Sequence, residues 1–322
     1  MRAIGIILAG GNSRKMKELT SKRAMAAMPV AGSFRAVDFA LSNMTHSGIG
    51  TVAVITQYNS RSLNEHLNSS KWWDFGRKNG GLYLFNPTIT ADHKEWYRGT
   101  ADAIAQNLDF LKERHEPYVV IASGDGIYKM DYSKMVDFHK DHSADATIAV
   151  LNVTLEEASR FGIMTCDNDR RIVDFTEKPK EPKSTLASMG IYVFTWEKLK
   201  KYLIENEKAG GSKDFGKDII PAMLQNNERM YAYSFEGYWK DVGTLYSLWE
   251  ANMDILNSSD LDLYDADWKI YSRNMSLPPQ YLGPEAQIQD SLICDGCNVN
   301  GKVNSSIVYS GVTIEGDAVV DH

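Results

Sequence analysis

Residues 4–11 read Ile-Gly-Ile-Ile-Leu-Ala-Gly-Gly and decide the fold of this chain. The apolar run that ends at Leu8 is typical of a buried parallel strand. The glycines that follow, Gly10 and Gly11, carry no Cβ and let the backbone approach a ligand closely. A polar, basic loop begins at Asn12, and free backbone N–H groups beside cations suit a phosphate chain. For a Gly-Gly pair taken alone, a plain turn is the alternative.

Length and composition bound the class of protein. The 322 residues exceed one average domain, so we expect a large domain and a smaller one. A net charge of −7 argues against a nucleic-acid partner, because such proteins usually carry a basic face. No apolar stretch approaches the roughly 20 residues of a membrane span, and the amino terminus lacks a signal-peptide pattern. We therefore expect a cytoplasmic protein without membrane association.

The cysteines are too few for a disulfide framework. Cys294 and Cys297 form a single Cys-x-x-Cys, without the second pair or histidine cluster that a metal site needs, and Cys166 stands apart. We expect all three to be ordinary side chains in a reducing cytosol.

Apolar runs alternate with helical patterns as far as about residue 240. The apolar runs predict strands at Ala3–Leu8, Thr51–Thr56, Tyr118–Ala122, Ala146–Val153, Ile172–Thr176, Ala187–Phe194 and Met230–Ser234. The patterns between them predict helices at Ala36–Ser47, Ser60–Leu67, Ala101–Arg114, Lys134–His142, Trp196–Asn206 and Gly216–Gln225. Such alternation indicates an α/β fold with a mostly parallel sheet and helices on both faces. Ligands of such sheets lie at the carboxyl ends of the strands, where Gly10, Asp125 and Lys178 fall.

The sequence divides into three parts, which we place at 1–244, 245–284 and 285–322. The first part is the α/β domain. The second holds a predicted helix, Leu245–Asn257, and a linker that contains Pro278-Pro279. The third is a small domain of a different character.

This third part consists of short polar–apolar units rich in Gly, Asn and Ser. A six-residue period relates Ile288, Cys294, Ser306, Val312 and Ala318, with Asn300 as a polar exception, and separately relates Val308, Ile314 and Val320. The period predicts coils of a left-handed parallel β-helix, with a plain β-meander as the alternative. The sequence stops inside a coil, whereas a solenoid normally ends in a cap. We therefore expect either a truncated solenoid or an incompletely ordered tail.

Two aspartates in different parts of the sequence are candidate metal ligands. Asp125 lies between glycines directly after the strand at Tyr118–Ala122, and Asp241 lies in Trp-Lys-Asp-Val-Gly at 239–243. Carboxylates from two segments can hold a divalent cation that bridges phosphates. Each also has an ordinary explanation, since Asp125 can cap the next helix and Asp241 can lie in a turn.

Two further stretches offer groups to a ligand. Lys178 follows a predicted strand within Glu-Lys-Pro at 177–179, and a lysine fixed beside a proline can bind a sugar phosphate as a point charge. A solvated lysine is the alternative. At 97–102, Tyr-Arg-Gly-Thr-Ala-Asp, small residues begin a helix and offer their backbone to a base or a phosphate. A well-capped helix without a ligand explains the same pattern.

Taken in order, these stretches resemble one family, the bacterial glucose-1-phosphate adenylyltransferases (ADP-glucose pyrophosphorylases). The stretches that carry the resemblance are 8–11, 34–35, 38–43, 55–58, 96–102, 123–125, 156–164, 177–179, 186–194, 214–221 and 239–244. The resemblance runs from residue 3 to about residue 315. Each stretch alone gives modest support for the resemblance, whereas the whole set in the same order gives strong support.

The resemblance implies a Rossmann-like nucleotidyltransferase domain followed by the start of a left-handed parallel β-helix. It implies that ATP and glucose 1-phosphate react with Mg²⁺ present to give ADP-glucose and pyrophosphate, for synthesis of glycogen or a similar storage α-glucan. The sugar phosphate attacks the α-phosphorus in line, while the protein positions the groups and neutralises charge. The family also implies a tetramer, of identical chains or with a paralogous subunit, and a small anionic effector.

By resemblance, the site residues fall into sets. The nucleotide would be held by Leu8, Ala9, Gly10, Gly11, Gln57, Gly99, Thr100, Ala101 and Asp125. Glucose 1-phosphate would be held by Tyr97, Gly162, Glu177, Lys178, Ser188, Tyr192 and Asp214. The metal ligands would be Asp125 and Asp241, and the catalytic residues Arg14, Lys15, Asp125 and Lys178. Candidates for the effector are Lys22, Arg23 and Arg35, for which a solvated basic face is the alternative.

The sequence departs from the family where the triphosphate is expected. After Gly-Gly the family has x-Gly-Thr/Ser-Arg-Leu, so Ser13 replaces a glycine and Lys15 occupies the position of the catalytic arginine. Lysine keeps the charge but loses the planar fork that stabilises a transferring phosphoryl group. Arg14 lies one residue early. Met25 replaces a lysine, and Gly126 replaces a histidine.

These departures leave several functions open. We favour an active adenylyltransferase whose altered triphosphate loop lowers its rate, because both candidate metal carboxylates are present. The main alternative is a weakly active or inactive subunit that binds substrate or effector and modulates a catalytic paralogue. A pyrophosphorylase for another sugar or base fits residues 96–102 and 186–194 less well. The C-terminal repeat is too short to form the active site of a hexapeptide-repeat acyltransferase.

Overall fold

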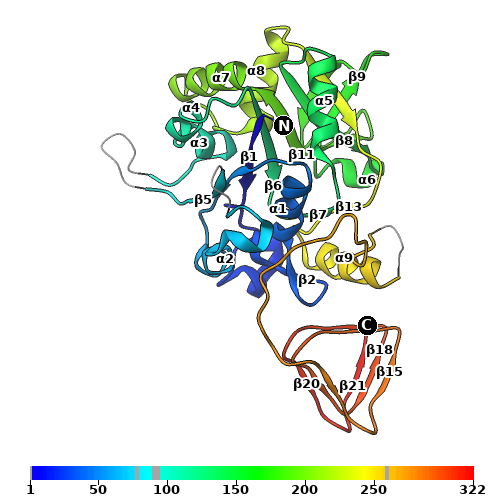
Figure 1. Ribbon diagram of the computed structural model, residues 1–322. Helices are drawn as coiled ribbons and strands as arrows, with labels where there is room; N and C mark the ends of the chain where they lie inside the picture. The colour runs from blue at the N-terminus through cyan, green and yellow to red at the C-terminus, as the bar shows by residue number, and fades with distance from the viewer. Residues whose placement is uncertain (1, 77–79, 89–94, 258–260) are drawn as a thin grey trace.

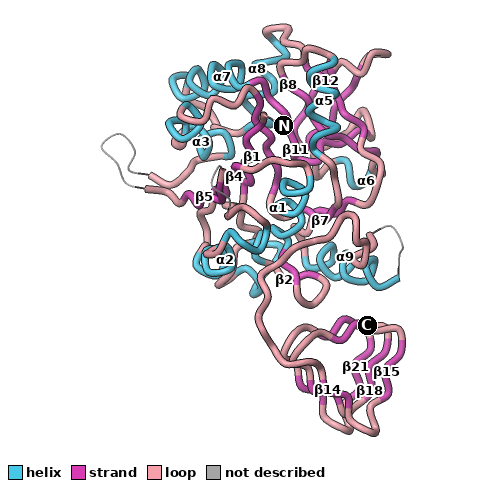
Figure 2. The backbone as a smooth tube through the Cα atoms, viewed as in Figure 1, coloured by secondary structure: helices cyan, strands magenta, loops and turns pink. Residues whose placement is uncertain are grey.

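The computed structural model describes residues 2–76, 80–88, 95–257 and 261–322 (Figure 1). A large α/β domain is followed by helix α9 (Leu245–Asn257), an extended segment and a separate triangular coil of short strands. Figure 2 shows the contrast between the two parts: helices surround the strands of the large domain, whereas the C-terminal coil consists of strands and loops. None of the helices in the described part of the chain is long and apolar enough to cross a membrane.

A nine-stranded sheet forms the centre of the large domain. Its strands are β1 (Ala3–Leu8), β4 (Thr51–Ile55), β5 (Gly81–Phe85), β6 (Tyr118–Ser123), β8 (Ala146–Asn152), β9 (Gly162–Cys166), β10 (Ile172–Glu177), β11 (Leu186–Thr195) and β12 (Met230–Ser234). The order is β10-β9-β11-β6-β1-β4-β5, and β8 joins β11 to β12.

The sheet is mixed. Strands β6, β1, β4 and β5 run parallel to one another, as predicted, and β8 and β12 form a second parallel pair. Strand β11 runs antiparallel to β6, β8 and β9, and β9 and β10 are also antiparallel. The apolar runs predicted where the strands lie but carry no information on their direction.

Helices and short turns complete the domain. They are α1 (Ala36–His46), α2 (Arg61–Leu67), α3 (Thr100–Ala105), α4 (Leu108–Lys112), α5 (Tyr132–Asp141), α6 (Leu155–Ala158), α7 (Trp196–Ala209) and α8 (Ile220–Gln225), with 3₁₀ turns at Arg14–Thr20, Met25–Ala27 and Ser70–Trp73 and a π turn at Phe215–Ile219. The helix predicted at Ala101–Arg114 is interrupted at Asn107, whose side-chain amide donates to the backbone oxygen of Ala103 (2.8 Å). Such a side chain competes with the helical backbone bonds. The helix predicted at Gly216–Gln225 begins as the π turn.

Strand β1 is buried on both faces, as the apolar run predicted. Ile7 packs in a cluster that contains Leu41 of α1, and Ile6 packs in a second cluster that contains Leu199 of α7. Successive side chains of a strand point to opposite faces of the sheet. The two clusters therefore form two layers of core, with the sheet between them.

The segment after α9 is not a free linker. Trp268 donates from Nε1 to Asn43 Oδ1 (2.9 Å), and the backbone N–H of Tyr271 donates to Ser42 Oγ (2.8 Å), so the segment lies along α1. Leu261 and Ile270 are buried. The segment 245–284, which we predicted as a helix and a linker, therefore includes residues that pack against the α/β domain.

The C-terminal coil is made of β14 (Tyr281–Leu282), β15 (Gln287–Gln289), β16 (Leu292–Ile293), β17 (Asn298–Val299), β18 (Lys302–Asn304), β19 (Ile307–Val308), β20 (Thr313–Ile314) and β21 (Val319–Asp321). These strands pair in parallel as three small sheets, which form the walls of a triangle (Figure 1). This arrangement is compatible with a β-helix.

The strict six-residue period was wrong in detail. Gln287 pairs with Lys302, and Lys302 pairs with Val319, so successive coils differ in length and are shorter than three six-residue units. One predicted set does face the interior, since Val308 and Ile314 are buried. In the other set Val312 is 37% exposed. The turns between strands have unequal lengths. The residues that point to the interior therefore do not recur at a constant spacing along the sequence.

Candidate active site

The parallel strands β1, β4 and β6 end at the same edge of the sheet, where a cleft of about 630 Å³ opens. Thirteen of the predicted site residues line it: Leu8, Gly10, Gly11, Gln57, Tyr97, Gly99, Thr100, Asp125, Glu177, Lys178, Tyr192, Asp214 and Asp241. An adjoining pocket of about 230 Å³ shares Asp125, Lys178 and Asp241 with the cleft and adds the predicted residues Gly162 and Ser188. Segments far apart in the sequence are thus brought together as predicted.

The glycine loop is fixed to the neighbouring strands. The N–H of Ala9 donates to Ile55 O (2.8 Å), and the N–H of Gly124 donates to Leu8 O (3.0 Å). A Cβ at Gly10 would lie 3.1 Å from the Cβ of Gln57, which is a tight contact. Glycine is therefore favoured at this position because the next strand end passes so close.

Gln57 connects the glycine loop to the segment before α3. Its amide donates from Nε2 to the backbone oxygen of Tyr97 (3.2 Å) and accepts at Oε1 from the backbone N–H of Tyr97 (2.7 Å). A Cβ at Gly99 would lie 2.3 Å from Lys213 O, so only glycine fits there. Thr100 Oγ1 donates to Asp214 Oδ2 (2.9 Å), which joins this segment to the sugar-phosphate set.

The two aspartates lie on adjacent backbone segments. Strands β7 (Gly126–Tyr128) and β13 (Trp239–Asp241) pair with Asp241 opposite Gly126, and the N–H of Val242 donates to Asp125 O (3.2 Å). Burial raises the pKa of Asp125. Burial, together with the neighbouring charge of Asp125, raises the pKa of Asp241 to about 6. The fold therefore holds two carboxylates close enough to repel each other.

This pair fits a magnesium ion. Mg²⁺ is usually bound by one or two carboxylates together with phosphate oxygens of a substrate and water. A cation would remove the repulsion that raises the pKa of Asp241. Among the described residues, no three or more His, Cys, Asp or Glu side chains gather in a group that could hold a metal ion. Further ligands of an ion between Asp125 and Asp241 would therefore come from substrate and water.

Lys178 stands at the sugar-phosphate end of the cleft in an unusual backbone conformation. Its φ is 47°, and its N–H donates to Phe161 O (3.0 Å). Non-glycine residues in this region are uncommon and gather at functional sites. Its ammonium group lies 3.5 Å from Glu177 Oε1. Burial raises the pKa of Glu177, and the charge of Lys178 opposes that shift.

Four predicted site residues line neither the cleft nor the adjoining pocket. Ala9 and Ala101 are buried and could offer only their backbone. Arg14 and Lys15 are exposed, in the 3₁₀ turn that follows the glycine loop. Ser13 caps this turn, because its Oγ accepts from Lys15 N (3.3 Å) while donating to Gly243 O (2.9 Å). The serine that replaces the family's glycine thus ties the loop to the strand end beside Asp241.

One functional candidate was not assigned from the sequence. Arg160 lines the adjoining pocket and donates from Nη2 to Asp241 Oδ2 (3.2 Å). It lies within the stretch 156–164 that carried part of the family resemblance. A basic residue two positions before a strand that begins with glycine was the available signal, but its partner lies 81 residues away in the chain.

Comparison with known proteins agrees with this arrangement. Residues 4–258 match the family model described as nucleotidyl transferase. A glucose-1-phosphate adenylyltransferase of Clostridium beijerinckii is 52% identical over 320 residues, which are 98% of this chain and 83% of that protein. Proteins of the same name from Geobacillus stearothermophilus and Clostridioides difficile are 50% and 49% identical over 99% of this chain and 83% of their own length. The chain therefore belongs to the glucose-1-phosphate adenylyltransferase family of nucleotidyl transferases.

Proposed function

We propose that this chain transfers the adenylyl group of ATP to glucose 1-phosphate and releases pyrophosphate, which makes ADP-glucose for storage α-glucan synthesis. One observation carries the proposal: a single cleft holds the glycine loop after β1, the pair Asp125 and Asp241, and Lys178. The shared name of relatives that are about half identical over nearly the whole chain supports the choice of substrates.

The two ends of the cleft suit the two substrates. The glycine loop offers backbone N–H groups to the triphosphate. Lys178 offers its ammonium group to the phosphate of the sugar, and Glu177 and Asp214 offer carboxylates to sugar hydroxyls. The phosphate oxygen of the sugar then attacks the α-phosphorus in line, and the bond to the β-phosphate oxygen breaks as pyrophosphate leaves. The work of these side chains is to orient both substrates and to hold charge.

Asp125 and Asp241 would hold Mg²⁺, whose charge would stabilise the negative charge on the transferring group. Ser123 donates to Asp125 and Arg160 to Asp241, so each carboxylate is oriented by a neighbour. Such outer contacts fix the direction in which ligand oxygens point.

We further propose that turnover is slower than in relatives with the usual loop. Met25 lines the triphosphate end, where the family has a lysine, and it brings no charge. Arg14 and Lys15 are exposed outside the cleft. Loss of one strong charge contact to a transition state lowers the rate on the order of 10²–10³-fold. Nothing in the structure favours the regulatory alternative over a slow enzyme.

We also propose a role for the C-terminal coil in assembly and a surface for an effector. The parallel walls of the C-terminal coil, with Val308 and Ile314 inside, support the start of a left-handed β-helix. Such a coil would contribute to a tetramer of identical chains or with a paralogous subunit. A small anionic effector would find Lys22 and Arg23 on the surface, whereas Arg35 already donates to Ser62 O (2.8 Å).

A nucleotide screen tests the proposal. Pyrophosphate release would be measured for the purified chain with glucose 1-phosphate, Mg²⁺ and each of ATP, UTP, GTP and CTP. We expect release with ATP that depends on glucose 1-phosphate. Faster release with another nucleotide would contradict the adenylyl assignment. Absence of release alone, followed by stimulation of a catalytic paralogue on mixing, would favour the regulatory alternative.

A further inference from the structure

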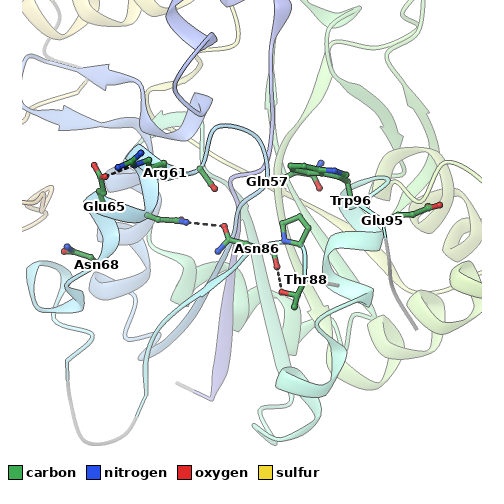
Figure 3. A pocket seen from close by; sticks show the side chains of 11 residues that line it. Gln57, Arg61, Glu65, Asn68, Asn86, Thr88, Glu95 and Trp96 are labelled. Atoms are coloured by element: carbon green, nitrogen blue, oxygen red, sulfur yellow. Dashed lines mark hydrogen bonds and ion pairs between the residues drawn. The ribbon is translucent and has the colours of Figure 1, made fainter. Parts of the chain in front are cut away.

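A second pocket, of about 820 Å³, shares Gln57 with the cleft but contains none of the other predicted site residues (Figure 3). Its walls come from α2, from the segment that follows β5 and from Trp96. Apart from Gln57, the residues that line this pocket have no role in the proposed reaction, and none was assigned to them from the family resemblance.

Amide side chains dominate one side of this pocket. Asn64, Asn68 and Asn86 line it together with Gln57, and Figure 3 labels the last three of these residues. Asn64 donates from Nδ2 to Asn86 Oδ1 (3.2 Å). Its own Oδ1 is buried and has no hydrogen-bond partner within the part of the chain that the structure describes. A buried carbonyl oxygen without a donor is unfavourable, so a ligand that supplies a donor after a small side-chain rotation would be favoured here.

An aromatic ring forms part of the opposite side. The Trp96 side chain is 59% exposed, and its ring stacks on that of Tyr58 with centroids 5.7 Å apart and planes 11° from parallel. Tyr58 supports one face of the indole from behind. A flat, supported indole offers apolar surface to the C–H groups of a ring that also carries hydroxyls.

The charges of the described lining residues disfavour an anionic ligand. Arg61 is paired with Glu65 (3.3 Å), and Glu95 adds a further negative charge. The described lining residues therefore present no net positive charge to a phosphate. A neutral ligand with many hydroxyl donors and acceptors matches both the amides and the unpaired carbonyl oxygen.

We propose that this pocket binds a neutral oligosaccharide, whose hydroxyl groups bond to Asn64 and its neighbouring amides while a sugar ring lies on Trp96. Gln57 also holds the backbone of Tyr97 in the cleft. A bound saccharide that contacts Gln57 would therefore alter the nucleotide end of the cleft. This coupling rests on the proposed function, whereas saccharide binding itself does not.

Titration calorimetry of the full chain with maltotriose, without nucleotide or sugar phosphate, tests the proposal. We expect saturable binding that weakens about tenfold in Trp96→Ala and in Asn64→Ala, because each removes one class of contact. The matched control is Trp249→Ala, another partly exposed tryptophan, on α9, which should keep the affinity. Cellotriose serves as a second neutral probe.

Two results would overturn the inference. One is the absence of binding to both trisaccharides. The other is binding that both Trp96→Ala and Asn64→Ala leave unchanged, whatever the effect of Trp249→Ala. Pyrophosphate release is measured separately: turnover without saccharide binding rejects this site alone, and saccharide binding without turnover rejects the proposed reaction alone.

Discussion

The sugar-phosphate end and the triphosphate end of the cleft differ in how charge is supplied. At the first, Lys178 and Glu177 already lie in the cleft and contact each other. At the second, Met25 is uncharged, and Arg14 and Lys15 are exposed in the turn after the glycine loop. The described cleft thus has a charged pair at the proposed sugar-phosphate end, whereas neither Arg14 nor Lys15 lines it at the proposed triphosphate end beside Met25.

One substitution from the family pattern fixes the loop that carries Arg14 and Lys15. Ser13 donates to Gly243 O and caps the 3₁₀ turn that begins at Arg14. A glycine could form neither contact and would leave the loop freer. The same serine links the loop to the segment that directly follows Asp241.

The largest expected effect is at the sugar-phosphate end. Lys178→Ala should lower kcat/KM for glucose 1-phosphate on the order of 10²–10³-fold, because the charge contact is lost. Both residues carry a Cβ, so the backbone conformation at φ 47° is equally strained in the variant. The measurement is steady-state pyrophosphate release. Lys180→Ala, two positions along and exposed, is the matched control and should keep the wild-type value.

The next largest effect is expected on the free energy of unfolding, at Asp241 in the cleft. The pKa of Asp241 is about 6 in the folded chain against 3.8 for an ordinary aspartate, so ionisation of this group opposes folding as pH rises through 6. Without divalent cations at about pH 8, Asp241→Asn should therefore be more stable than wild type, by up to about 3 kcal/mol, with the lost Arg160 contact offsetting part of this.

Thermal unfolding at several pH values checks this prediction. The advantage of Asp241→Asn should shrink as the pH falls toward about 5, because the wild-type carboxyl is then protonated in the folded state. Asp137→Asn, at an exposed position of α5, should show no such dependence. A variant that is less stable than wild type at every pH would mean that the two carboxylates do not repel each other in the folded chain.

At the triphosphate end, one charge should be recoverable. Met25→Lys should raise kcat/KM for ATP about tenfold, because the ammonium group would enter the cleft wall that Met25 now lines. The KM for glucose 1-phosphate should stay the same. Met25→Leu, of similar volume and without charge, is the control. An unchanged rate in Met25→Lys would indicate that another cation already neutralises the triphosphate.

The smallest effect is expected at the tether. Ser13→Gly removes the contact with Gly243 O and the cap on Lys15 N, which should lower the stability of the folded chain by about 1 kcal/mol. The rate should rise, by less than about tenfold, since Arg14 and Lys15 become free to approach ATP. Ser13→Ala removes the same bonds without adding backbone freedom. Equal rates in the two variants would show that the tether, and not the glycine, limits the loop.

Much of the fold and of the candidate site could be predicted from the sequence. The bounds of β1 and β12 agree with the apolar runs, because buried strands need continuous apolar residues. Strands β5 and β9 were missed, since β5 is only partly buried and β9 carries polar residues. The glycine loop and Asp125 could be placed together because parallel strand ends share one edge, whereas Asp241 was joined to them by the family resemblance.

The remainder depends on contacts between distant residues. Neither the pairing of Arg160 with Asp241 nor the bond from Ser13 to Gly243 leaves a local pattern, since 81 and 230 residues separate the partners. The family resemblance assigned roles to Arg14 and Lys15 from their positions in the chain, but such a position does not say whether a side chain lines the cleft.

The central claim is that one cleft, built around Asp125 and Asp241, joins ATP to glucose 1-phosphate. Pyrophosphate release by Asp125→Asn, compared with wild type and with Asp137→Asn at matched folding, tests it most directly. The account predicts that release in the wild type and in Asp137→Asn requires both substrates, and that Asp125→Asn loses it on the order of 10²-fold or more. Wild-type turnover by a folded Asp125→Asn chain would contradict it.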